Sequence, residues 1–233
     1  MQDTISANVA AVQARIAAAA RRGGRDPSAV TLVAVTKTRS PAEVEAAVRA
    51  GVRHLGENRV EEAEHKIPQL RLPGVSWHMV GHLQSRKARQ AAGLFDMIQS
   101  VDSVRLARKL DALAGERDAP LAVLIEVNVS GEGTKYGFPL SDRPALEAAV
   151  AEIAGLRHLC LQGLMTVAFI AQDPEEVRPV FGGLRALRDD FRARFPQVDL
   201  RHLSMGMTDD FEVAVEEGAT IVRIGRALFG PRM

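Results

Sequence analysis

The sequence predicts a single (β/α)8 (TIM) barrel with one extra N-terminal helix, as one domain over residues 1–233. Eight short runs rich in Val, Ile and Leu alternate with amphipathic helical stretches. Most runs are apolar at consecutive positions, so each strand needs cover on both faces, as in a parallel sheet between helices. Eight such units favour a closed barrel, and an open doubly wound sheet is the alternative. The predicted strands are residues 31–37, 54–58, 76–81, 97–102, 121–128, 158–165, 202–206 and 221–225.

The helices are predicted from apolar stripes and from their start signals. Residues 5–22 form an alanine-rich helix whose apolar stripe begins at Ile5, and two glycines end it. Ser40 supplies an N-cap, with a proline at the first helical position and a capping-box glutamate two residues after it. Residues 173–176 repeat this pattern before a long apolar stripe. Such a strand-then-helix order places any chemistry where strands end and βα loops begin.

Charge and cysteine content narrow the class of protein. The chain has 30 Lys and Arg against 29 Asp and Glu, a net charge of +1, which argues against nucleic-acid binding by phosphate neutralisation. The single cysteine, Cys160, cannot form an intramolecular disulfide, and its apolar neighbours predict a buried strand position. The N-terminus has neither the basic nor the apolar region of a secretory signal, and no stretch is long enough to span a bilayer. We therefore expect a cytoplasmic protein that binds neither nucleic acid nor membrane.

The first predicted strand delivers a lysine at its last position. With period-2 alternation Lys37 shares a face with Val33 and Val35. If that face points into the barrel, desolvation lowers the lysine pKa and favours a nucleophilic amine. The alternative is a lysine that reaches from the strand end to solvent. Asn58, at the second strand end, suits contact with a phenolate or carbonyl oxygen, or else caps the following helix.

The loops after the last two strands suggest a phosphate pocket. Ser204 and Gly206 stand between the seventh strand and a helix start, and Gly225 ends the eighth strand. In this fold these two loops commonly hold phosphate, because backbone N–H groups favour an anion and glycine lets it approach closely. Asp209 and Asp210 would repel a phosphate, so we interpret them as helix N-terminal caps.

Two other patterns do not support a site. The loop 131–137 resembles a dinucleotide loop, but its last glycine comes one position late. It does hold Lys135 and Tyr136, whose roles the sequence leaves open. His78 and His82 have metal-ligand spacing for a helix, yet they flank a glycine at a strand end with no Cys or carboxylate beside them. No metal site is therefore predicted.

Seven segments spread over nearly the whole chain resemble the pyridoxal 5'-phosphate homeostasis (binding) proteins, which are related in fold to the N-terminal barrel of alanine racemase. The segments are residues 33–37, 56–58, 77–84, 128–137, 163–165, 203–209 and 222–225. The sequence departs from the family pattern at Arg86, where many relatives have asparagine, and at Arg226, where threonine is frequent.

The resemblance implies a cofactor and its site. By it, Lys37 carries pyridoxal phosphate as a Schiff base, and the loops after the last two strands hold the phosphate. Asn58 lies near the ring, and Arg223 lies near the pyridine nitrogen or the phosphate. The implied cofactor-binding residues are Lys37, Asn58, Ser204, Gly206, Arg223 and Gly225.

An arginine beside the pyridine nitrogen would oppose its protonation and weaken the cofactor as an electron sink. The chain also ends after its eighth unit, whereas the racemase takes its second acid–base group from a further domain. We therefore expect a monomeric carrier or buffer of pyridoxal phosphate with no catalytic residue, and apo forms of pyridoxal-phosphate enzymes are candidate recipients. One alternative is a pyridoxal-phosphate racemase or lyase that uses Lys37 with Tyr136 or Lys135. The other is a class I Schiff-base aldolase acting on a sugar phosphate, which would be colourless.

Overall fold

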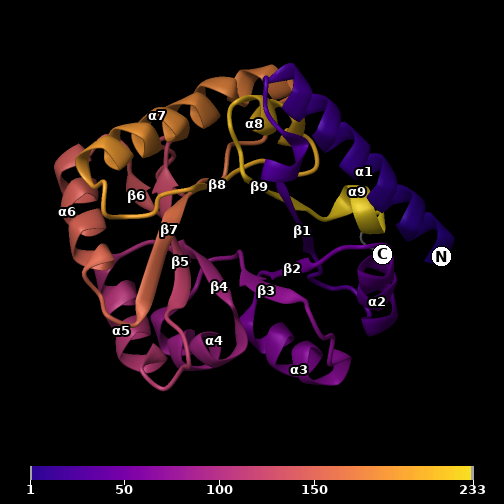
Figure 1. Cartoon of the computed structure of the whole chain (residues 1–233), viewed down its shortest axis with the longest axis horizontal. Helices are drawn as coiled ribbons and strands as arrows, with labels where there is room; N and C mark the ends of the chain where they lie inside the picture. Colours follow the sequence, from indigo (N-terminus) through magenta and orange to yellow (C-terminus); the bar gives the residue numbers. More distant parts are fainter. Residues whose placement is uncertain (1, 232–233) are drawn as a thin grey trace.

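The computed structural model describes residues 2–231, which form a closed barrel of eight parallel strands surrounded by helices (Figure 1). The barrel closes because β9 pairs with β1 and β4 pairs with β5. Its strands in order around the ring are β1 (Thr31–Val35), β2 (His54–Glu57), β3 (Ser76–Met79), β4 (Met97–Val101), β5 (Leu121–Asn128), β7 (Leu159–Met165), β8 (His202–Ser204) and β9 (Ile221–Ile224). The predicted fold class is confirmed, and all eight predicted strands are present.

The helices cover the outside of the barrel. They are α1 (Gln2–Arg22), α2 (Pro41–Arg49), α3 (Val60–Leu70), α4 (Ala88–Leu94), α5 (Val104–Ala114), α6 (Arg143–Ala154), α7 (Arg178–Arg194), α8 (Phe211–Glu216) and α9 (Arg226–Phe229), with 3-10 turns at Pro27–Ala29, Ser85–Lys87 and Pro174–Val177. The capping box predicted at Ser40 begins α2, whereas the one at Asp173 begins the 3-10 turn before α7. The extra helix α1 lies outside the ring of strands, against α2, α8 and α9 (Figure 1).

Apolar side chains form two separate layers because strand residues alternate between the two faces of the sheet. One layer lies between the strands and the helices and includes Ala34, Leu55 and Trp77. The smaller layer lies inside the ring and consists of Val33, Val80, Met97, Leu124, Met165 and Ile221. Other inward positions carry polar side chains such as His78, Gln99, Ser204 and Arg223, so charged and hydrogen-bonding groups gather in the interior of the barrel.

Three local expectations are wrong or incomplete. Cys160 is half-buried rather than buried, because it lies on the inward face of β7, opposite to Leu159 and Leu161 of the outer layer. A two-residue strand, β6 (Phe138–Pro139), pairs with the end of β5 and was not predicted. It needs Gly137, where φ is +102° and a Cβ would come within 2.8 Å of the Glu126 carbonyl oxygen. Strands β1 and β2 also end earlier than predicted, so Lys37 and Asn58 lie in the loops that follow them.

None of the helices described between residues 2 and 231 is both long and apolar enough to cross a membrane.

Candidate functional site

Lys37 lies two residues beyond the carboxyl end of β1, in the turn that follows the strand. Val33 belongs to the interior apolar layer and Val35 packs against it. Thr36, which points the other way, is fully buried and donates its hydroxyl hydrogen bond to Glu57 Oε1 at 2.6 Å. Lys37 itself is half-buried. Lys37 therefore follows a strand whose inward residues, Val33 and Val35, belong to or pack against the interior apolar layer.

A chain of hydrogen bonds crosses the interior of the barrel and joins side chains of β9, β8, β4, β3 and β2. Arg223 donates from Nη1 to Ser204 Oγ at 2.6 Å, and the Ser204 hydroxyl donates to Gln99 Oε1 at 2.6 Å. The Gln99 amide nitrogen lies 2.9 Å from His78 Nδ1, and His78 Nε2 lies 3.0 Å from His54 Nδ1. Since Gln99 Oε1 accepts from Ser204, its amide must donate to His78, which leaves the His78 hydrogen on Nε2.

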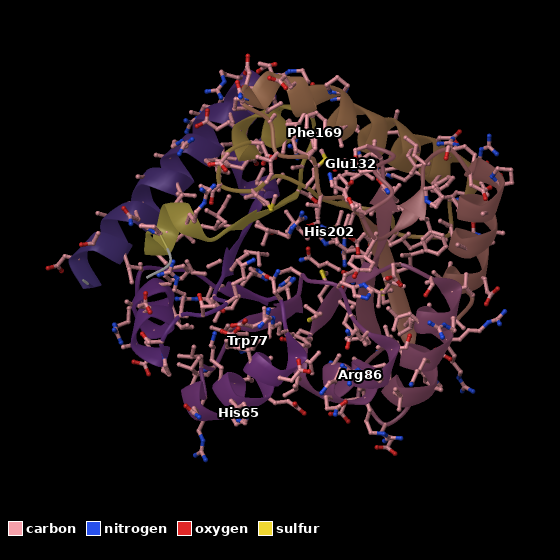
Figure 2. The ribbon with its side chains drawn as sticks, turned by 180° about the vertical axis from the view of Figure 1, so that it is seen from behind. His65, Trp77, Arg86, Glu132, Phe169 and His202 are labelled. Carbon is pink, nitrogen blue, oxygen red and sulfur yellow. The ribbon has the colours of Figure 1, made fainter. Side chains whose placement is uncertain are left out.

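Burial favours the neutral form of three histidines inside the barrel, His54, His78 and His202. Burial, together with the neighbouring His54 and His202, lowers the pKa of His78 to about 3. Burial likewise lowers the pKa of His54 and of His202. Figure 2 shows His202 within the ring of strands and Trp77 outside it, toward α3. Neutral histidines suit this position, because a protonated imidazole would bury a charge and an N–H group that has no acceptor.

Arg223 is the central cation of the interior. Its side chain is 4% exposed, and its Nη2 donates to the Thr166 carbonyl oxygen at 2.8 Å. Burial lowers its pKa to about 10, while Glu126 and Asp210 favour the charged form. The guanidinium is therefore charged at neutral pH and fixed in orientation by two neighbouring strands. The Ser204 hydroxyl donates to Gln99 and accepts from Arg223, so it holds the guanidinium in place.

The two predicted glycines lie just after the neighbouring strands β8 and β9. Gly206 has a φ of +91°, and a Cβ there would come within 2.6 Å of the Ala214 Cβ, so both its backbone and its surroundings require glycine. A Cβ on Gly225 would lie 3.5 Å from the Val35 carbonyl oxygen, which places Gly225 beside the end of β1. The Arg223 N–H donates to the Gly206 carbonyl oxygen at 3.0 Å and ties the two loops together.

Asn58 follows β2, on the other side of β1. It does not cap α3, because Arg59 occupies the N-cap position and makes no side-chain capping bond. Its backbone packs against Gly81, where a Cβ would come within 2.4 Å of the Asn58 carbonyl oxygen. All six predicted cofactor-binding residues thus lie on, or just after, the adjacent strands β8, β9, β1 and β2.

The sequence reasoning missed Glu126, which lies on β5, four strands from β1 in either direction around the ring. It faces inward like Leu124, is 8% exposed, and its Oε2 has no hydrogen-bond partner among residues 2–231. Its pKa is raised to about 7, mainly by burial and also by nearby Asp102, while Arg223 opposes the shift. A single acidic residue inside the apolar run of β5 was the available signal.

Further polar groups lie in the loops after β3 and β5. His82 Nδ1 lies 3.1 Å from Asp102 Oδ2, and the His82 ring stacks on Tyr136 with centroids 3.6 Å apart. The Lys135 amine lies 2.6 Å from Glu132 Oε1 and 6.0 Å from the centre of the Phe169 ring, so the loops after β5 and β7 meet here (Figure 2).

The interpretation of Asp209 and Asp210 as helix caps needs correction. Asp210 occupies the N-cap position of α8, but its carboxylate accepts from the Met207 N–H at 2.6 Å and makes no capping bond to the helix. Asp209 forms an ion pair with Arg226 instead. The Asp210 carboxylate therefore stabilises the loop between β8 and α8, and the Asp209 carboxylate joins this loop to α9. Across the described part of the chain, no group of three or more His, Cys, Asp or Glu side chains is placed to hold a metal ion.

Comparison with known proteins identifies the family. Residues 7–233 match the family of the alanine racemase N-terminal domain. The pyridoxal phosphate homeostasis protein of Pseudomonas aeruginosa is 43% identical over 229 residues, which cover 98% of this chain and 96% of that protein. The protein of the same name from Escherichia coli K12 is 42% identical over 234 residues, covering 98% and 97%. The chain belongs to the pyridoxal phosphate homeostasis protein family.

A solved structure of a similar protein has the same architecture. PipY of Synechococcus elongatus PCC7942, solved with pyridoxal phosphate bound, superposes with a TM-score of 0.85 and is 36% identical. The match covers 97% of this chain and all of PipY. The barrel of this homeostasis-family chain is therefore shared with relatives over its whole length.

Proposed function

We propose that the chain binds pyridoxal 5'-phosphate through a Schiff base on Lys37 and acts in intracellular pyridoxal-phosphate homeostasis as a carrier or buffer, without dedicated catalytic turnover. The observation that carries the proposal is the grouping of a lysine, a buried arginine and two glycine loops at the ends of three adjacent strands, β1, β9 and β8. Membership of the homeostasis family supports the same conclusion.

The residues present fit this cofactor. The Lys37 amine is the group that an aldehyde requires: its Nζ attacks the aldehyde carbon, a C=N bond forms, and the aldehyde oxygen leaves as water. Gly225 is half-buried beside the end of β1 and has no side chain to keep a phosphate from its backbone, whereas Gly206 is buried and lets the loop after β8 turn. The unpartnered Oε2 of Glu126 is a buried polar atom that a polar ligand could satisfy. When bound, pyridoxal phosphate supplies an electrophilic carbon and an electron-withdrawing ring.

Each remaining site residue has a proposed task. Arg223 supplies a fixed positive charge toward the pyridine nitrogen or the phosphate. Ser204 holds that guanidinium through its hydroxyl and contributes its loop backbone to the phosphate site. Asn58 orients the ring from the neighbouring strand end. Asp210 anchors the Met207 N–H and so shapes the loop that carries Gly206.

Arg223 also supports a carrier over an enzyme. With a pKa of about 10 the guanidinium stays charged at neutral pH, and a positive charge near the pyridine nitrogen disfavours its protonation. One observation favours the racemase or lyase alternative: Glu126 lies on the opposite strand with a pKa of about 7, suited to proton transfer. Deuterium exchange at the α-carbon of a panel of amino acids separates the two, because a carrier gives no exchange at enzymatic rates.

The setting is proposed to be the cytoplasm, with the chain acting as a monomer that delivers cofactor to apo forms of pyridoxal-phosphate enzymes. The single cysteine and the self-closed barrel support this setting and this state. Sedimentation velocity tests the monomer. Transfer to an apoenzyme is tested by adding an excess of a free-pyridoxal-phosphate scavenger, which should not stop a direct handover.

The decisive experiment is to trap the adduct. Purified protein is mixed with pyridoxal phosphate, reduced with borohydride and digested, and the modified peptide is identified by mass spectrometry. We expect a yellow protein whose visible band disappears on reduction and whose pyridoxyl group lies on Lys37. Lys37→Ala should lose the band and the label, while Lys109→Ala, which removes an exposed lysine from α5, should keep both. A label on another lysine, or a colourless wild type that turns over a sugar phosphate, would refute the proposal.

A further inference from the structure

Lys37 is joined to the chain by two peptide units, and both are held from outside the barrel. The residue before it, Thr36, is fully buried, and its N–H donates to the Gly56 carbonyl oxygen at 2.9 Å. The residue after it, Thr38, has a φ of +62°. This left-handed conformation is unfavourable for a β-branched residue, so surrounding contacts must maintain it.

The contacts come from an ion cluster between β2 and α3, formed by Glu57, Glu62 and Lys66. Lys66 Nζ donates to Glu57 Oε1 at 2.6 Å and to Glu62 Oε1 at 2.8 Å. Lys66 is 7% exposed and Glu57 is fully buried, so neither charge is screened by bulk water. Glu62 is less buried and lies in the first turn of α3.

Each member of this cluster also bonds to a residue beside Lys37. Lys66 Nζ donates its third hydrogen bond to the Thr36 carbonyl oxygen at 2.7 Å. Glu57 Oε1 accepts from the Thr36 hydroxyl at 2.6 Å, and Glu62 Oε1 accepts from the Thr38 N–H at 2.5 Å. The carbonyl of the peptide unit before Lys37 and the N–H of the unit after it are therefore bonded to one cluster.

We propose that Glu57, Glu62 and Lys66 are positioning residues that fix both peptide units of Lys37 and thereby set the rate at which its amine reacts with the cofactor aldehyde. The inference rests on the proposed function. The cluster acts through the backbone, because its members bond to Thr36 and Thr38 rather than reaching into the barrel. A lysine side chain has many rotamers, and a mobile backbone would multiply the positions of its amine. A fixed backbone keeps more molecules in the reactive geometry.

The alternative is that the cluster only attaches α3 to the barrel. Substitutions of Glu62 distinguish the two roles, because Glu62 is partly exposed and its alanine and glutamine variants differ in whether an acceptor for the Thr38 N–H remains. Glu62→Ala removes the acceptor of the Thr38 N–H, whereas Glu62→Gln keeps an oxygen that can accept from it. Glu61→Ala is the matched control, since it removes the same charge from the same turn of α3 but breaks only an exposed ion pair with Lys87.

The test measures amide hydrogen exchange at Thr38 in cofactor-free protein, and the rate at which borohydride-trapped pyridoxyl accumulates on Lys37. We expect Glu62→Ala to speed the Thr38 exchange and to slow adduct formation by roughly tenfold. Glu62→Gln should recover most of the wild-type rates, and Glu61→Ala should match wild type. The midpoint of thermal unfolding is recorded for all variants, and it should not follow the order of the adduct rates.

Two results would overturn the inference: Glu62→Ala forming the adduct at the wild-type rate, or Glu61→Ala slowing it equally. If wild type itself carries no adduct on Lys37, the proposed function fails. The Thr38 exchange then still decides whether the cluster holds the backbone, because that measurement needs no cofactor.

Discussion

The two halves of the barrel mouth differ in how well their polar groups are satisfied. On β8, β9 and β1 the guanidinium of Arg223, the hydroxyl of Ser204 and the backbone around Lys37 all have short hydrogen bonds to protein. On β5, opposite, Glu126 is buried with an unpartnered oxygen and a carboxylate neighbour, Asp102. Such an atom costs about 1–3 kcal/mol unless something satisfies it. In the first half the protein already satisfies the polar groups and holds them in place. In the second half a ligand or a proton would satisfy the unpartnered oxygen of Glu126.

The strongest test of the first half is Arg223→Met. Removing a buried guanidinium leaves the Ser204 hydroxyl and the Thr166 carbonyl without their partner, so we expect a loss of about 3–5 kcal/mol in the free energy of unfolding. Pyridoxal-phosphate affinity should fall at least tenfold. Urea unfolding and absorbance titration measure the two effects, with Arg201→Met as control because Arg201 is exposed and pairs only with Asp199. An Arg223→Met protein with wild-type stability would contradict the picture of a fixed cation.

Glu126→Gln tests the unsatisfied half through its pH dependence. The folded-state pKa of about 7 lies above the ordinary 4.5, so the folded protein binds this proton more tightly than the unfolded chain. That contribution to stability is fully present below pH 4.5 and is lost as the pH rises through 7. We therefore expect the variant to gain about 3 kcal/mol in stability relative to wild type between pH 4.5 and pH 8.

The comparison is made by urea unfolding at several pH values, with Glu116→Gln, an exposed residue, as the control that should show no such trend. A pH-independent difference between wild type and Glu126→Gln would show that Glu126 is already satisfied.

The smallest expected effects come from alanine substitutions of Gly206 and Gly225. The first should lower stability, and the second should lower cofactor affinity. Gly206→Ala puts a side chain at a φ of +91° and against Ala214, so we expect a loss of about 1–2 kcal/mol in stability. Gly225→Ala meets only ordinary contacts and should stay within about 0.5 kcal/mol of wild type. Its methyl group occupies the space beside β1 and should lower cofactor affinity severalfold. Equal stability losses in both variants would remove the distinction.

Much of the fold could be predicted because its signals are local. The apolar runs, the capping boxes at Ser40 and Asp173, and the lysine after the first strand can each be read within a few residues. The predicted site residues lie on adjacent strands for the same reason: in a parallel barrel all strand ends meet on one rim. Asp209 and Asp210 were misread because their partners, Arg226 and Met207, are chosen by the shape of a loop.

The sequence by itself determined the order of strands and helices, the family resemblance and the placing of an amine and two glycines at strand ends, because short-range patterns encode them. Only the tertiary structure decided which buried groups pair. Ser204 meets Gln99 across 105 residues of chain, and Lys66 of α3 reaches the peptide unit before Lys37. Closing the ring brings such residues within hydrogen-bond distance. The spacing of apolar residues along the chain carries no information about these distances. The same closure leaves Glu126 facing the site with a carboxyl oxygen still unpaired.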